Sequence, residues 1–526
     1  MNALELPSEI LNKILVYAVF TRRLKRSLRL RLVCKTFSTA VITALFDSRL
    51  LDGSGPGGFS KSYGPWQIRN REYLFGLFHR YLVYRLNNER SGELNRLLEM
   101  REIATLLREH STVNLSTINE KLCWLGYKYA FPIKHRKEYW KERGYVKTED
   151  GRRQQGGVLI PNRGLNLLAA AAYFDLVPLV LQLLTERHAP DTHNYMFPSA
   201  LEAAAWAGNS NMVQTLQSDM ANQPGFAELD LVTKWIKLAG KRVIIGATIR
   251  GDLQFLKWSM YPEALGPRSD TILAGEAVGQ IARESKLGTA IYAAQRCTRS
   301  PEIHKYLQSF LNESLIELEP NWLARDFCNH CEWGNTSMVE YYLDNGVNVN
   351  SPWRLDRATA LCIAAQSCQE PIVDLLLARG ADPNFNAEVY SQFTPLPLAA
   401  SSGSLAMVRK LLDHGAYPNE KLNALIRLPA LWYAVATENT AMIHLLEARG
   451  ASFDVLLDGQ PWIGGIAMEM AEELFLDSMF DLLKERGIQI GDRLNDTGCA
   501  PWRKWNLKNN PPRNNPNWEM YKLEFF

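Results

Sequence analysis

The sequence predicts an all-α protein: a solenoid of helix–turn–helix–loop units, preceded by a small helical domain and a helical connector. A sequence motif that ends in glycine recurs every 34 or 35 residues in the second half, and apolar residues keep helical spacing over most of the chain. The hydrophobic share of 46% and the charged share of 22% are ordinary for folded domains. At 526 residues the chain is too long for one ordinary core, which indicates either about three domains or an extended array.

Residues 1–50 are predicted to form two or three short amphipathic helices. Pro7 stands at a helix start, and the apolar residues that follow it share one helical face. A second apolar face recurs over residues 30–46. So small a domain buries little area by itself, so its remaining apolar face is either a partner surface or a face that docks on the same chain.

The sequence motif of this segment resembles an F-box. Leu-Pro-x-Glu-Ile-Leu-x-x-Ile-Leu begins at Leu6, and Leu-Val-Cys-Lys-Thr-Phe begins at Leu32, although Phe37 stands where that family commonly has tryptophan. F-box proteins bind a Skp-type adaptor and, through it, a cullin-RING ubiquitin ligase. The resemblance implies adaptor contacts at Leu6, Pro7, Ile10, Leu11, Ile14, Leu15, Val33, Cys34 and Phe37. Leucines interrupt the basic run 22–31, which favours a solvated helix face over a localisation signal or a phosphate contact.

Residues 51–160 are predicted to be a helical connector of unassigned role. Apolar residues space like buried helix faces over 73–82 and 94–107. The glycine-rich stretch 53–58 has neither a strand before it nor a helix after it, so it is interpreted as a linker and not a nucleotide site. An unrecognised enzyme in this region stays as a lower-ranked alternative.

The recurring motif lies in residues 318–490, with its glycines at Gly346, Gly380, Gly415 and Gly450. Each unit predicts a helix, a turn, a second helix and a loop, and the glycine after the second helix takes the left-handed backbone there. The stretch Thr-Pro-Leu-Pro-Leu-Ala-Ala from Thr394 places proline at the first helical position and small alanines where a neighbouring helix approaches.

These units resemble ankyrin repeats, whose pattern is Thr-Pro-Leu-His, paired alanines, a Leu-Leu run and Gly-Ala-Asp. Four repeats are expected over 318–452, with a degenerate fifth that ends the stack near residue 490. Similar but eroded pieces at 165–188, 200–216 and 243–258 predict degenerate repeats over 161–317. Another helical-hairpin array is the alternative for both regions.

The loops between repeats are the expected target-binding surface. Within them Trp353, Arg354, Tyr390 and Phe393 are residue types typical of binding hot spots, although each could equally serve local packing. The tail, residues 491–526, mixes tryptophan with asparagine and proline, and is interpreted as partly disordered or as a docking peptide.

Several function classes are disfavoured. The first 160 residues are rich in Lys and Arg and the remainder in Asp and Glu, but the basic residues form no dense tract, so no nucleic-acid partner is expected. Asp175 and Pro178 interrupt the longest apolar stretch, which argues against a membrane span. Cys328, His330 and Cys331 lack a second ligand pair at zinc-site spacing, so packing is favoured over metal binding.

The sequence therefore predicts a non-catalytic substrate receptor with no catalytic residues, metal or cofactor. Its box would bind the ligase adaptor and its repeats an unidentified target protein. The N-terminus lacks the layout of a signal peptide, and the eight cysteines are too few for a disulfide framework, so an intracellular location in cytoplasm, nucleus or both is expected. An ankyrin scaffold with no link to a ubiquitin ligase is the alternative.

Overall fold

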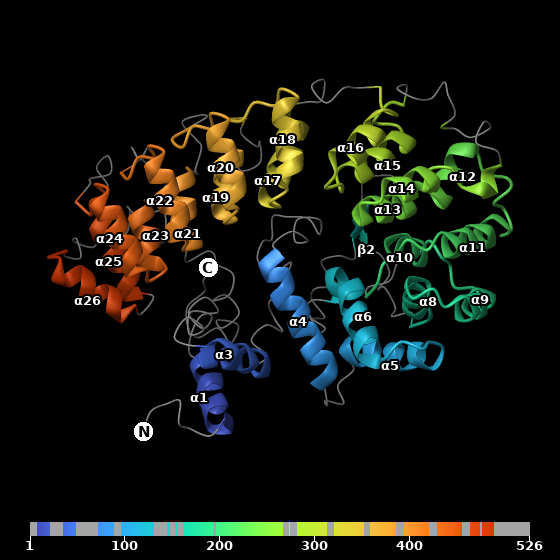
Figure 1. The fold of residues 1–526 in the computed structure, drawn as a ribbon, viewed down its shortest axis with the longest axis horizontal. Helices are drawn as coiled ribbons and strands as arrows, with labels where there is room; N and C mark the ends of the chain where they lie inside the picture. The colour runs from blue at the N-terminus through green and yellow to red at the C-terminus, as the bar shows by residue number, and fades with distance from the viewer. Residues whose placement is uncertain are drawn as a thin grey trace. The chain divides into compact units, whose positions relative to one another are not determined.

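The computed structural model is almost entirely helical, as the sequence predicts, and divides into two compact units, residues 1–314 and 315–526 (Figure 1). A short antiparallel hairpin, β1 (Tyr145–Lys147) and β2 (Arg153–Gln155), departs from this pattern, and the sequence analysis did not predict it. The structure describes residues 8–20, 35–48, 72–88, 96–130, 145–147, 153–155, 163–192, 196–266, 273, 281–312, 320–351, 358–385, 394–419, 429–454, 463–473 and 476–488.

The first unit begins with the N-terminal helices and the connector. Helices α1 (Ser8–Phe20) and α3 (Lys35–Asp47) pack against each other. Three connector helices follow: α4 (Glu72–Asn88), α5 (Arg96–Glu109) and α6 (Leu115–Ala130). Each of the three carries fully buried apolar residues, so the connector has a core of its own.

Helix pairs follow the connector. They are α8 (Arg163–Tyr173) with α9 (Val177–Thr185), α10 (Ala200–Ala207) with α11 (Ser210–Ala221), α13 (Ile245–Arg250) with α14 (Leu253–Ser259), and α15 (Lys286–Gln295) with α16 (Pro301–Gln308). The first helices of successive pairs pack side by side. Asn166 on α8 donates to Glu99 on α5 at 2.7 Å, which joins this array to the connector.

An insertion interrupts the first unit's pairs. Helix α12 (Leu231–Leu238) precedes η5 (Gly240–Ile244), a π-helical turn that runs directly into α13; the 3₁₀ turn η6 (Glu263–Leu265) follows α14. Gly246 lets α13 approach α10, because a Cβ at this position would lie 2.7 Å from that of Ala205.

The second unit repeats the same helix–turn–helix order. Its described pairs are α17 (Pro320–Glu332) with α18 (Thr336–Asp344), α19 (Ala360–Gln366) with α20 (Glu370–Ala378), α21 (Pro395–Ser402) with α22 (Leu405–Asp413), α23 (Ala430–Ala436) with α24 (Thr440–Ala448), and α25 (Ile463–Glu473) with α26 (Asp477–Glu485). The first helices pack in sequence, and Ala399 and Ala400 are fully buried where α21 meets its neighbours. Short side chains at these contacts let the helices lie close together.

Residues with a left-handed backbone conformation follow the ends of the helices in these pairs. Gly403 ends α21 at φ +79°, and Gly380 follows α20 at φ +83°. In the first pair of the array, Asp175 and Arg187 take the equivalent positions at φ +60° and +64°. The turn geometry therefore persists where the glycines of the repeat pattern are absent from the sequence.

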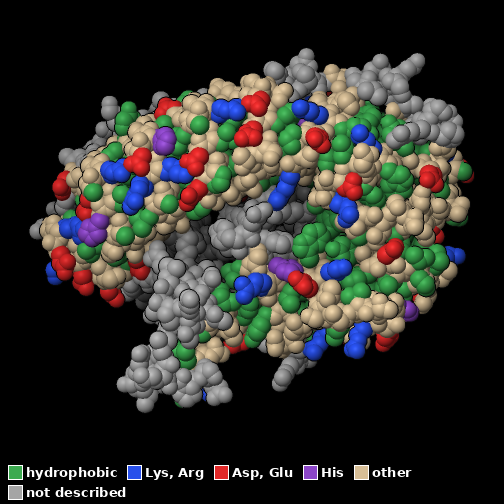
Figure 2. Space-filling model, viewed as in Figure 1, with side chains coloured by type: hydrophobic (Ala, Val, Ile, Leu, Met, Phe, Trp, Pro, Cys, Tyr) green, Lys and Arg blue, Asp and Glu red, His purple; other side chains and the backbone are tan. Residues whose placement is uncertain are grey.

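Ion pairs join the second helices of neighbouring pairs in the second unit, and Figure 2 shows basic and acidic side chains interspersed over it. We call these contacts the ion-pair series: Arg379 with Asp344 at 2.8 Å, Lys410 with Asp374 at 2.7 Å, Arg449 with Asp413 at 2.7 Å and Arg486 with Glu447 at 3.0 Å. Each pair links one repeat to the next. Because these side chains are partly exposed, each pair stabilises the stack by at most about 1 kcal/mol.

Candidate interaction surfaces

Helix α1 presents an apolar stripe to solvent. Ile10, Ile14 and Tyr17 are 48%, 48% and 73% exposed, and their spacing of four and three residues puts them on one face. Leu11 and Leu15, by contrast, are buried. Of the seven large apolar side chains exposed in the described residues, three thus lie on this one helix, which makes its exposed face a candidate interaction surface.

Asp47 at the end of α3 ties the N-terminal helices to the connector. Its carboxylate accepts hydrogen bonds from the Asn12 amide on α1, at 2.9 Å, and from the Tyr84 hydroxyl on α4. Burial and the bond to Asp47 raise the pKa of Tyr84 to about 12. The ring of Phe46 lies 5.3 Å from that of Tyr81. The contacts of Asp47 thus hold α1 to the connector without involving the exposed residues of α1.

The nine positions implied by the F-box resemblance divide into three groups. Ile10 and Ile14 are exposed, and Leu11 and Leu15 are buried and so support the helix without facing solvent. The remaining five fall outside the described residues, or, for Phe37, lie in a helix whose side chain there is not described: Leu6, Pro7, Val33, Cys34 and Phe37. Tyr17, which shares the exposed face, was missed because it follows the quoted motif.

A row of asparagines fixes the start of each inter-repeat loop in the second unit. Asn350, Asn384 and Asn419 each lie four residues after a repeat glycine, and each bridges to the next repeat. The Asn384 amide donates to the Gly415 carbonyl at 2.8 Å and accepts from the Tyr417 N–H at 2.8 Å. We call these three residues the asparagine row. Their spacing of 34 and 35 residues in the sequence was the signal that could have revealed them.

The loops that leave this row carry the predicted target-binding residues. Trp353, Arg354, Tyr390 and Phe393 all lie outside the described residues. Tyr417, which the sequence analysis did not single out, is 61% exposed at the start of its loop. Since its backbone N–H is held by Asn384, this ring is displayed from a fixed position.

Packing accounts for the cysteine and histidine residues of α17. Cys328, His330 and Cys331 are buried, and burial raises the pKa of both thiols. The His330 ring lies 5.1 Å from that of Trp333 and 5.5 Å from that of Tyr342. Over the part of the chain that the structure describes, no three His, Cys, Asp or Glu side chains are grouped as metal ligands would be.

No helix among the described residues is both long enough and apolar enough to span a bilayer. A stack of helical pairs with exposed apolar residues and ordered loop starts defines a helical-repeat scaffold that binds proteins. Residues 327–422 match the family model of ankyrin repeats, in three copies. The chain therefore contains ankyrin repeats within the region where the recurring motif predicted them. No curated protein matches the chain.

Proposed function

We propose that this protein is a substrate receptor of a Skp–cullin–F-box type ubiquitin ligase. Helix α1 binds a Skp-type adaptor, the ankyrin repeats bind an intracellular target protein, and the chain itself catalyses no reaction. The observation that carries the proposal is the exposed stripe of Ile10, Ile14 and Tyr17 on a helix whose sequence resembles an F-box.

The energetics of the stripe favour a protein partner. Moving each of these exposed apolar side chains out of water would contribute on the order of 1 kcal/mol to binding. Leu11 and Leu15 fix α1 on α3, so the stripe is presented by a rigid helix. Rigid presentation reduces the entropy lost on binding.

In this function the protein works by proximity. A receptor that holds the adaptor at one end and the target at its repeats raises the effective concentration of target lysines beside the ligase-bound ubiquitin. No nucleophile, metal or cofactor of the chain takes part in the bond-forming step.

A second candidate function, an ankyrin scaffold with no ubiquitin-ligase link, is favoured by a different observation. The N-terminal helices dock on their own chain through Asp47 and Tyr84 and through the rings of Phe46 and Tyr81. In that case α1 would be a structural helix that packs with α3 at the N-terminal side of the connector.

Affinity capture separates the two. Full-length protein is expected to recover a Skp-type adaptor and a cullin, and Ile10→Lys/Ile14→Lys to recover at least tenfold less, because two charges replace apolar contacts. Leu231→Lys is the matched control, since Leu231 is 40% exposed on α12 and far in sequence from α1. Circular dichroism confirms that each variant folds. The receptor proposal fails if the wild type recovers no adaptor, or if the double variant recovers as much as the control.

A further inference from the structure

The ion-pair series has no counterpart between α9 and α11 in the first unit. At two steps of the second unit an acid lies two residues after the third buried position of one second helix, and a base lies three residues after that of the next. At the first of these steps Asp344 follows Tyr342, and Arg379 follows Leu376. The same count from Leu183 and Leu216, the equivalent buried residues, reaches Thr185 and Asp219.

The second type of pair in the series is missing as well. Asp374 and Lys410 lie two and one residues before their buried leucines. At those positions α9 and α11 have Leu181 and Thr215. In both cases the position that holds the cation in the second unit has no Lys or Arg here: Asp219 replaces the arginine and Thr215 the lysine. The helices α9 and α11 therefore cannot form the ion pair that joins neighbouring second helices in the second unit.

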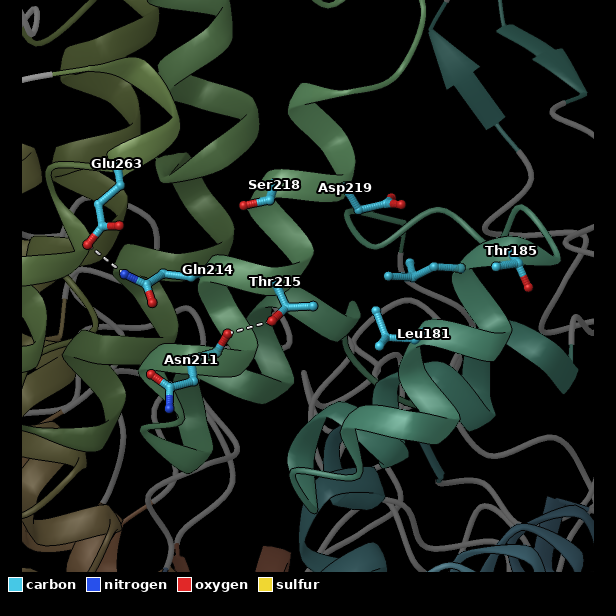
Figure 3. Close-up of a pocket in the computed structure, with 9 residues that line it drawn as sticks. Leu181, Thr185, Asn211, Gln214, Thr215, Ser218, Asp219 and Glu263 are labelled. Atoms are coloured by element: carbon cyan, nitrogen blue, oxygen red, sulfur yellow. Dashed lines mark hydrogen bonds between the residues drawn. The ribbon is translucent and has the colours of Figure 1, made fainter.

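A groove lies at this step. It is an open groove of about 760 Å³ between α9, α11 and the turn η6 (Figure 3). Asp219 and Leu181 project into the space between the two helices in the figure, and Glu263 lies beside Gln214. We call this the α9–α11 groove; its described lining is Leu181, Leu184, Thr185, Asn211, Gln214, Thr215, Ser218, Asp219 and Glu263.

The groove combines an apolar wall with uncompensated negative charge. Leu181 is 48% exposed and, with Leu184, forms the apolar part of the described lining. Asp219 and Glu263 carry the charge, and neither Lys nor Arg occurs in the described lining. Their hydrogen-bond donors within the groove region are neutral amides: Gln223 to Asp219 at 3.2 Å and Gln214 to Glu263 at 2.6 Å. The charge is therefore available to an external cation.

We propose that the α9–α11 groove binds a segment of a partner protein that presents an arginine or lysine next to an apolar side chain. The cation pairs with Asp219, which stands at the position of Arg379 in the second unit, and so replaces the ion pair that this step of the array lacks; its aliphatic stem and apolar neighbour cover Leu181. A long basic side chain suits such a site because its stem packs on apolar surface while its head stays at the carboxylate. The sign of the charge disfavours acidic peptides and anionic lipid surfaces. The site goes beyond the proposed function, since it lies outside the repeats 327–422 and needs no ligase adaptor.

A direct binding assay tests the proposal on the full-length chain. The probe is a fluorescent peptide that alternates arginine with leucine, compared with the same peptide carrying glutamine in place of arginine. The arginine peptide is expected to bind, and the glutamine peptide to bind at least tenfold more weakly. Asp219→Asn should weaken the arginine peptide about two- to fivefold, the range for one exposed charge pair. Thr185→Asp, which adds a carboxylate, should tighten it by a similar factor.

The decisive variant rebuilds the missing ion pair. Thr185→Asp/Asp219→Arg places an acid and a base at the positions of Asp344 and Arg379, and is expected to abolish peptide binding while leaving the thermal melting temperature unchanged or higher. Glu302→Gln on α16 is the control, because it alters the net charge by the same amount outside the groove. The proposal is overturned if wild type fails to bind the arginine peptide, or if the rebuilt variant binds it as well as the control does. Neither outcome depends on capture of a Skp-type adaptor.

Discussion

Asn384 provides the sharpest test of how the ankyrin repeats are held in register. Its side chain makes two hydrogen bonds to the next repeat, donating to the Gly415 carbonyl and accepting from the Tyr417 N–H, both at 2.8 Å. A neutral hydrogen bond contributes about 1 kcal/mol net, so Asn384→Ala should lower the free energy of opening at this loop by about 2 kcal/mol. Asn384→Asp keeps the acceptor but loses the donor, so it should cost about half as much or more.

Hydrogen exchange of the full-length protein is the appropriate assay, because local opening in a repeat array does not require global unfolding. The Tyr417 amide should exchange about tenfold or more faster in Asn384→Ala. Asn345→Ala is the control, since the Asn345 amide donates to Tyr341 within its own repeat. Equal exchange at Tyr417 in the two variants would refute the idea that the asparagine row couples neighbouring repeats.

Three further predictions concern packing, ion pairs and pH. Gly246→Ala should lower the melting temperature because the added Cβ would meet α10, whereas Gly240→Ala, whose Cβ would lie 3.4 Å from its nearest neighbour, should have a much smaller effect; calorimetry compares them. Asp413→Asn should destabilise by less than about 1 kcal/mol, and high salt should erase the difference, because its pair with Arg449 is exposed. For Tyr84, the folded pKa of about 12 exceeds its ordinary value of 10.0, so its contribution to stability is present below pH 10 and is lost as the pH rises toward 12; Tyr84→Phe should remove this loss in pH-dependent unfolding.

Local signals in the sequence predicted the helices of the repeats well. Helix α21 begins at Pro395 and ends at Gly403, because proline suits the first helical turn and glycine adopts the left-handed conformation that ends it. The pair α15 and α16 lies within the degenerate repeats predicted over 161–317, but it was not located individually, since no glycine follows it to mark a repeat. The hairpin β1–β2 was also missed, because three-residue strands are too short to show alternation.

The candidate surfaces were predictable only in part, because exposure depends on tertiary contacts. Ile10 and Leu11 are adjacent and similar in sequence, yet one is 48% exposed and the other buried, according to which side of α1 meets α3. Spacing alone divides the residues of a helix into faces, but does not say which face a neighbour covers. The charged contacts between repeats join residues 35 to 39 positions apart in sequence, so they emerge only once the repeats are aligned by their buried positions.

The asparagine row and the ion-pair series explain where partner sites are expected in this array. Wherever a repeat contact is satisfied by its neighbour, as at Arg379 and Asp344, the surface charge is already neutralised and offers little to a partner. Wherever the contact is missing, as at Thr185 and Asp219, the carboxylate keeps its charge beside an exposed leucine. Tyr417 differs, because its backbone makes the regular contact with the asparagine row while its ring is exposed. In a repeat protein, departures from the repeated contact are therefore the places to look for binding, because regular positions are already occupied by the next repeat.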